Sequence, residues 1–189
     1  MVMGHTVPEL LLLLGFVLAF THFMTMGAIT FARDAGDDLA AGVAQFSFLV
    51  TGAIGAMVLG VRGHVALWNG IAALVLLVCA LLLYEWARRT IRDRGFHIAW
   101  SGDVPAELCT AGPYGFIRHP AYLSYVLAFL ALLIALPGIA AAAILLVNAA
   151  LYSHAAATDE RSLLASPLGG DYARYRRATG MFLPKIGWR

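Results

Sequence analysis

The chain has few charged residues, and this shortage excludes most soluble classes of protein. Aspartate, glutamate, lysine and arginine make up 13% of the 189 residues, whereas 61% are hydrophobic, and the mean hydropathy is +0.79. A soluble domain of this length is far less apolar, so the composition indicates a membrane protein. The formal net charge of +2 is too small to indicate a nucleic-acid partner.

Cysteine is also scarce, with only two residues in the chain. Cys79 lies in an apolar stretch and Cys109 in a polar connection, so a disulfide between them is not expected. Neither cysteine has histidine, cysteine or acidic residues at metal-ligand spacing, and we therefore expect no zinc or other metal site.

Long apolar stretches dominate what is present. A spanning helix needs about 20 mostly apolar residues. The sequence therefore predicts an all-α, polytopic membrane bundle of about five transmembrane helices, the fourth of them short. The first stretch is too long for the core of a signal peptide and is expected to be retained. The candidate spans are 7–31, 41–61, 66–86, 122–136 and 139–157.

Basic residues are distributed unevenly along the chain, which predicts its orientation. They cluster at 88–94, at Arg118 and from Arg161 to the end, and such segments face the cytoplasm by the positive-inside rule. The amino terminus is then outside, and the carboxyl terminus and the polar motifs are cytosolic. A composition rich in alanine and arginine but poor in lysine favours a bacterial inner membrane.

The run GPYGFIRHPAYLSY, residues 112–125, places polar side chains at the mouth of an apolar segment. Such groups cost free energy at the edge of the hydrocarbon unless they are paired or face a protein cavity. An interfacial anchor of tyrosine and arginine is the alternative interpretation. A helix beginning at Pro120 would place His119 at its amino terminus.

A second polar block, DERSLLASPLGGDYARYRRATGMFLP, spans residues 159–184. Before it, Asn148, Tyr152 and Asp159 recur at helical spacing, so they are expected on one face that meets the RHP segment. Gly169 and Gly170 are expected to end that helix, and Asp171 to cap a last short helix.

Together the two blocks resemble the isoprenylcysteine carboxyl methyltransferase family and its phospholipid methyltransferase relatives. The shared pattern is GPY-x-x-x-RHP-x-Y, a short hairpin, an acidic pair, glycine, Y-x-x-Y and a final proline. The resemblance implies an integral membrane enzyme that uses S-adenosyl-L-methionine. It also implies a single membrane domain in which 1–87 form a scaffold and 88–189 form a cytosolic cofactor pocket.

The resemblance also implies which residues form the site. An aromatic and polar pocket would enclose the cofactor, with Tyr172 and Tyr175 closing over it. One of the two acids would bind the cofactor ammonium or the ribose hydroxyls. The expected cofactor-binding residues are Leu108, Cys109, Tyr114, His119, Pro120, Ala121, Tyr122, Asp159, Glu160, Tyr172 and Tyr175.

Three residues are expected to act in the reaction itself. Arg118 offers a fixed set of donors for a carboxylate, on the cofactor or on an acidic substrate. A carboxylate acceptor needs no general base, whereas a thiol or amine must lose a proton, for which His154 and Glu160 are the candidates. His154 stands where eukaryotic family members carry a substrate-side arginine, and Arg161 stands where the second acid is usual.

The methyl acceptor is expected to be lipid-like or apolar and to arrive from the bilayer, with membrane lipids as the surrounding partners. An isoprenylcysteine-type carboxylate, a lipid amine and a lipid thiol all remain open. Two other functions are also open: an NADPH-dependent, sterol-type membrane reductase with a similar HP-x-Y element, and a non-enzymatic membrane scaffold.

Overall fold

The computed structural model describes residues 7–31, 52–53, 65–92 and 107–185. Within these ranges the chain is helical, and its only strand-like feature is an isolated parallel bridge between Ile117 and Gly180. The predicted all-α class is therefore confirmed. The elements are α1 (Val7–Phe31), α3 (Leu67–Arg92), the 3-10 helix η1 (Gly112–Gly115), α4 (Pro120–Ala135), α5 (Ile139–Ala165) and α6 (Gly169–Ala178).

The described part contains three helices long and apolar enough to cross a bilayer, α1, α3 and α5, together with the shorter apolar helix α4. The predicted span 41–61 lies outside the described residues except for positions 52 and 53. Large apolar side chains such as Leu18, Leu82 and Leu146 are exposed on the long helices. Because hydrocarbon chains can cover such surfaces, the fold is that of an integral membrane protein.

Two helices end at positions different from those that the sequence predicts. The surface connector was expected from residue 88, but α3 continues to Arg92 because Glu85 pairs with Arg88 and Arg89 along its last turns. For α5, the apolar span was expected to end at 157 and the helix itself at Gly169 and Gly170, and the helix ends before that pair, at Ala165.

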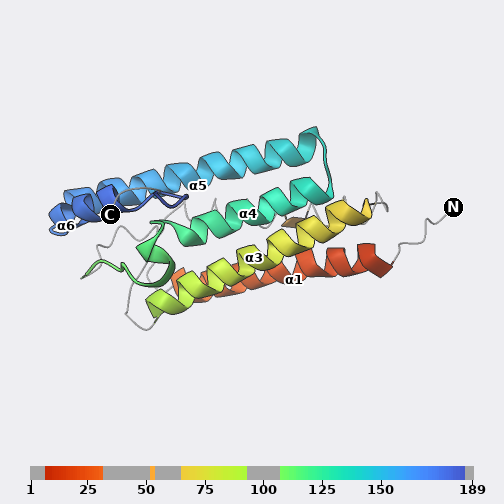
Figure 1. Cartoon of the computed structure of the whole chain (residues 1–189), viewed down its shortest axis with the longest axis horizontal. Helices are drawn as coiled ribbons and strands as arrows, with labels where there is room; N and C mark the ends of the chain where they lie inside the picture. Colours follow the sequence, from red (N-terminus) through yellow and green to blue (C-terminus); the bar gives the residue numbers. More distant parts are fainter. Residues whose placement is uncertain (1–6, 32–51, 54–64, 93–106, 186–189) are drawn as a thin grey trace.

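The helices form an elongated bundle (Figure 1). α1 and α3 run side by side in one direction, α4 runs back against α3, and α5 returns alongside α4. The turn at Pro137 and Gly138 joins α4 to α5, as predicted. We call the end at which α3 and α5 finish and α4 begins the motif end, because both polar blocks meet there.

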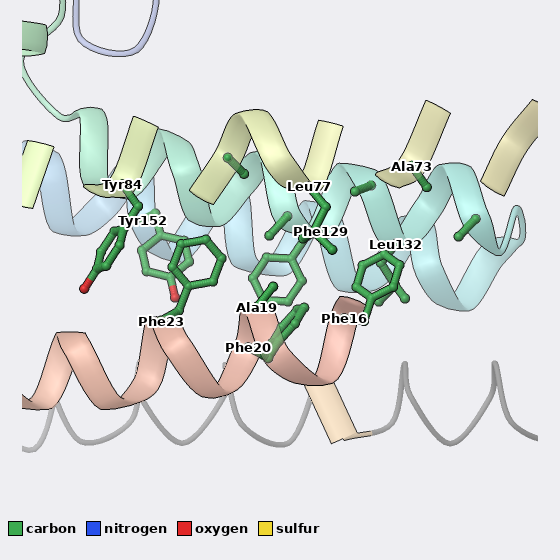
Figure 2. Packing of buried hydrophobic residues seen from close by; sticks show 14 of the residues in the cluster. Phe16, Ala19, Phe20, Phe23, Ala73, Leu77, Tyr84, Phe129, Leu132 and Tyr152 are labelled. Atoms are coloured by element: carbon green, nitrogen blue, oxygen red, sulfur yellow. The ribbon is translucent and has the colours of Figure 1, made fainter. Parts of the chain in front are cut away.

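Small residues let α3 and α4 approach closely, and aromatic rings fill the space toward α1. α3 buries one face that includes Ala73, Leu77 and Ala80, an arrangement typical of helix contacts in membranes. Figure 2 shows the rings of α1 directed toward α4, and the Phe20 and Phe129 centroids lie 5.7 Å apart. This core fixes the position of α4, and therefore of the motif at its amino terminus.

Candidate functional site

The motif run turns into α4 at His119. Pro120 is the first residue of the helix and His119 is its amino-terminal cap, as the sequence predicts. The backbone just before the helix is held by the carboxyl-terminal segment, residues 179–185. The amide of Arg118 donates to the Gly180 carbonyl at 2.9 Å, and that of His119 donates to the Met181 carbonyl at 3.1 Å.

Glu160, in the last turns of α5, is the centre of an ion-pair network. Its Oε1 lies 2.7 Å from Arg118 Nε and 3.4 Å from His119 Nε2, and its Oε2 lies 3.1 Å from Arg176 Nε. The Glu160 side chain is 4% exposed and that of Arg118 is 7% exposed. Charges removed from water to this degree require partners, so the network joins α4, α5 and α6.

Arg118 also holds the end of α6. Its Nη1 donates to the carbonyl of Arg176 at 3.3 Å and to the carbonyl of Thr179. Lys185 Nζ donates to the carbonyls of Arg176 and Arg177, each at 2.9 Å. Because the last carbonyls of a helix have no intrahelical partner, these two cations stabilise the carboxyl terminus of α6.

Asp159 occupies a separate position beside the Glu160 network. Its Oδ2 accepts a hydrogen bond from Tyr122 Oη at 3.0 Å. The Tyr122 ring stacks on His119 with centroids 5.6 Å apart, and on Tyr152 with centroids 5.7 Å apart. Asn148 and Tyr152 are buried on α5, so the predicted shared face of α5 does meet the RHP segment.

The stacked rings continue across the bundle toward α1. Tyr125 lies 5.2 Å from Tyr152 and 5.6 Å from Tyr84, and Phe23 lies 5.0 Å from Tyr84, all between ring centroids. These aromatic residues belong to the core of the bundle, and Figure 2 shows Tyr84, Tyr152 and Phe23 grouped at one end of it.

The 3-10 helix η1 connects the motif to α3. Tyr114 packs with Ala87 of α3, and Cys109 lies against this small cluster. Gly112 has φ +55, and an added Cβ would lie 2.5 Å from Thr90 Oγ1, so glycine is required there.

Tyr175 joins α6 to η1, since its hydroxyl donates to the Tyr114 carbonyl at 2.7 Å. Burial raises the pKa of Tyr175 to about 12, which keeps this hydroxyl protonated at neutral pH. Tyr172, one helical turn earlier, is 2% exposed, and its hydroxyl has no partner among the described residues. The predicted tyrosine pair of α6 therefore faces the motif.

The structure brings most of the predicted residues together and separates one. His154 is exposed and lies on the side of α5 opposite Tyr152, away from the Glu160 network. Leu108 and Ala121 are half-buried at the edges of the site. The residues gathered around the α4 amino terminus are Arg118, His119, Pro120, Tyr122, Asp159, Glu160 and Tyr172, with Tyr114, Cys109 and Tyr175 on the η1 side.

Sequence reasoning missed Arg176, which contacts Glu160 directly. Its signal is helical spacing, because Arg176 lies four residues after Tyr172 and so shares its face of α6. The expected junction between α5 and α6 was also wrong. α5 ends at Ala165, Leu168 caps α6, and Asp171 lies in the first turn, where it pairs with Arg174.

Comparison with known proteins places the chain in a family. The model of the phospholipid methyltransferase family matches residues 68–169, more than half of the chain. Among curated proteins, none matches.

A solved structure is also similar, that of the eukaryotic intramembrane Ras methyltransferase, isoprenylcysteine carboxyl methyltransferase. The similarity has a TM-score of 0.63 at 18% identity and covers 96% of this chain and 70% of that one. This likeness supports the helical fold, and the family match includes α4, both acids of α5 and nearly all of α3. These findings indicate a membrane methyltransferase, and the chain belongs to the phospholipid methyltransferase family.

Proposed function

We propose that this protein transfers a methyl group from S-adenosyl-L-methionine to a lipid-like or apolar acceptor within the membrane. The observation that carries the proposal is a group of buried donors beside a separate carboxylate. Tyr172 Oη makes no hydrogen bond within the described residues, and the nearest acceptor to His119 Nε2 there is Glu160 Oε1, in a long 3.4 Å contact that is not a hydrogen bond. Asp159 is hydrogen-bonded to Tyr122, whose ring stacks on His119. Buried polar atoms without partners are uncommon and mark places where a ligand can bind.

The residues present fit the amino-acid end of that cofactor, which carries a carboxylate and an ammonium group. His119 and Tyr172 would donate to the carboxylate, and Asp159 would accept from the ammonium. Of the two acids, Glu160 already has a guanidinium group on each oxygen. Asp159 accepts from the neutral hydroxyl of Tyr122, so it is the acid that is open to a cation.

Stacked tyrosine rings suit the remaining parts of the cofactor. The faces of aromatic rings attract cations and stack on planar bases, and Tyr122 and Tyr152 lie next to Asp159. When bound, S-adenosyl-L-methionine supplies an electrophilic methyl group on a positively charged sulfur. The chain itself would position the reactants and exclude water, and no covalent enzyme intermediate is needed.

The acceptor is proposed to carry a carboxylate, an amine or a thiol and to enter from the bilayer. A carboxylate needs no proton acceptor. An amine or a thiol would need a general base. The exposed His154 lies on the opposite side of α5 and cannot take that role. Glu160 is a poor base because each of its oxygens is already paired with a guanidinium group. The arrangement therefore favours an acceptor that is already deprotonated when it binds.

Residues 88–189 are proposed to form the site and residues 1–87 its scaffold, with the motif end in the cytoplasm. The arginines of α3, Arg118 and those of α6 all lie at the motif end, which agrees with the positive-inside rule. Leu108 and Cys109 would line the approach from η1, and Tyr175 would hold α6 over the site.

Calorimetric titration of the detergent-purified chain tests the proposal. S-adenosylhomocysteine should bind saturably, and NADPH, run in parallel, should not. His119→Ala removes one of the two proposed carboxylate donors and should abolish measurable binding of S-adenosylhomocysteine. His154→Ala is the matched control and should bind as the unmodified chain does. Binding of NADPH alone would establish a reductase instead, and binding of neither ligand would favour a scaffold.

A further inference from the structure

The Glu160 network holds more positive than negative charge. One carboxylate is in contact with two guanidinium groups, those of Arg118 and Arg176, and with the imidazole of His119. Arg118 alone balances the charge of Glu160, and its side chain is 7% exposed. Arg176 is the surplus cation, with a side chain that is 51% exposed. Because half of its side chain is exposed, this guanidinium can also bind an anion that enters the site.

The two arginines differ in which of their donors are occupied. Arg118 uses Nε for Glu160 and Nη1 for two carbonyls of the α6 terminus, so it is fixed in place. Arg176 contacts Glu160 through Nε, 3.1 Å from Oε2, and its Nη1 and Nη2 donate no hydrogen bond to the described residues. The Nε contact therefore orients the guanidinium while its terminal nitrogens stay available. Such a planar pair of donors matches a carboxylate bidentately.

The neighbours of Arg176 complete a site for a carboxylate. Tyr172 lies one turn earlier on the same face of α6, is 2% exposed, and has a hydroxyl without a partner among the described residues. His119 Nε2, on the other oxygen of Glu160, is also buried, and its 3.4 Å contact with Oε1 is too long for a normal hydrogen bond. We infer that Arg176 is a cofactor-binding residue, whose terminal nitrogens bind the carboxylate of the methyl donor together with Tyr172 and His119. The inference rests on the proposed function and moves carboxylate recognition from Arg118 to Arg176.

Two ligands that differ only by the amino-acid end separate this role from a structural one. S-adenosylhomocysteine carries the carboxylate, and 5′-methylthioadenosine lacks the whole amino-acid portion. In the full chain, Arg176→Gln should weaken binding of S-adenosylhomocysteine about tenfold to one-hundredfold, as for other charge-assisted hydrogen bonds. Binding of 5′-methylthioadenosine should change by less than about twofold, within the usual scatter for surface substitutions. Arg176→Lys keeps the charge without the paired donors and should give an intermediate loss.

Arg177→Gln is the matched control, because Arg177 is exposed on the same helix, carries the same charge, and its side chain does not contact Glu160. It should leave the binding of both ligands unchanged. Equal weakening of both ligands by Arg176→Gln would show that Arg176 only supports the fold, and it would overturn the inference while leaving the proposed function intact. Unchanged binding of S-adenosylhomocysteine by Arg176→Gln would also overturn the inference and leave the proposed function intact. Failure of the unmodified chain to bind either ligand would overturn the proposed function, and with it the inference.

Discussion

Glu160 is the side chain on which the motif end depends most. It is nearly inaccessible to solvent and joins three helices through Arg118, His119 and Arg176. Removing one member of a buried ion pair leaves the other charge without compensation, which costs more than the pair contributes when it is intact. The network therefore has a structural role in addition to the ligand-binding role proposed for His119 and Arg176.

Glu160→Gln should destabilise the protein by about 3 kcal/mol, because it leaves the buried guanidinium of Arg118 unpaired. The midpoint of thermal unfolding in detergent should fall accordingly. Asp171→Asn is the control, since Asp171 pairs with Arg174 in an exposed pair on the surface of α6. That change should cost at most about 0.5 kcal/mol. Equal midpoints for the two variants would show that the Glu160 network contributes no stability.

Most of the clustered side chains could be predicted from the sequence, and the exceptions have physical reasons. His119 and Tyr122 stand in one short motif at the start of α4, and Asp159 stands on a predicted face of α5. Because α4 and α5 are antiparallel, these side chains come into contact. Arg176 stands among several arginines that the positive-inside rule already explains. Helical spacing places Arg176 on the same face as Tyr172, but its contact with Glu160 also depends on the angle between α5 and α6, which spacing does not provide.

Among the helices, the junction of α5 with α6 decides whether Tyr172 and Tyr175 reach the site. Gly169 opens α6 close to the end of α5, and a Cβ there would lie 2.3 Å from the Leu164 carbonyl oxygen. A Cβ on Gly170 would meet nothing within 4 Å. A side chain is therefore sterically excluded at Gly169 and tolerated at Gly170, although both glycines lie at the start of α6.

Gly169→Ala should displace α6 and cost about 1–3 kcal/mol, as for other substitutions that force a steric overlap. Gly170→Ala should be neutral or stabilise the helix by up to about 1 kcal/mol. The thermal midpoint and the affinity for S-adenosylhomocysteine report both effects. If Gly169→Ala bound the ligand as tightly as Gly170→Ala, the position of α6 would have no part in the site.

The sequence predicted a helix boundary at Gly169 and Gly170, but it assigned these glycines to the end of α5 instead of the start of α6. A Gly-Gly pair after an apolar helix is typical of a helix end, whereas here the helix ends at Ala165 and Gly169 begins the next one. Glycine is needed for a close approach of two backbones, and only the three-dimensional structure reveals such an approach. In contrast, Pro120 and Pro137 mark their helix boundaries correctly, because proline acts on its own backbone.

The molecule as a whole has its polar groups at one end and an aliphatic bundle beyond them, an asymmetry that the sequence predicts well. Hydropathy predicts the helices, and the arginines predict which ends lie together. The length of α3 was underestimated, because ion pairs of Glu85 with Arg88 and Arg89 continue the helix beyond its apolar stretch. The cytosolic orientation of the motif end remains a prediction.

Labelling of single cysteines tests that orientation. In a chain without Cys79 and Cys109, Ala178→Cys places a thiol at the exposed end of α6, and Gly138→Cys places one in the exposed turn at the opposite end. A membrane-impermeant maleimide should label Ala178→Cys in inside-out vesicles and Gly138→Cys in right-side-out vesicles. The reverse pattern would place the motif end outside the cell.

Transfer of a labelled methyl group tests the central claim most directly. The purified chain, reconstituted with a total membrane lipid extract, is incubated with S-adenosyl-L-methionine labelled on its methyl group, and the label extracted into organic solvent is measured. We expect the unmodified chain and His154→Ala to transfer label, and Asp159→Asn to transfer almost none. If the extract gained no label although S-adenosylhomocysteine bound, the acceptor would not be a membrane lipid. Equal transfer by Asp159→Asn would contradict the site described for this chain.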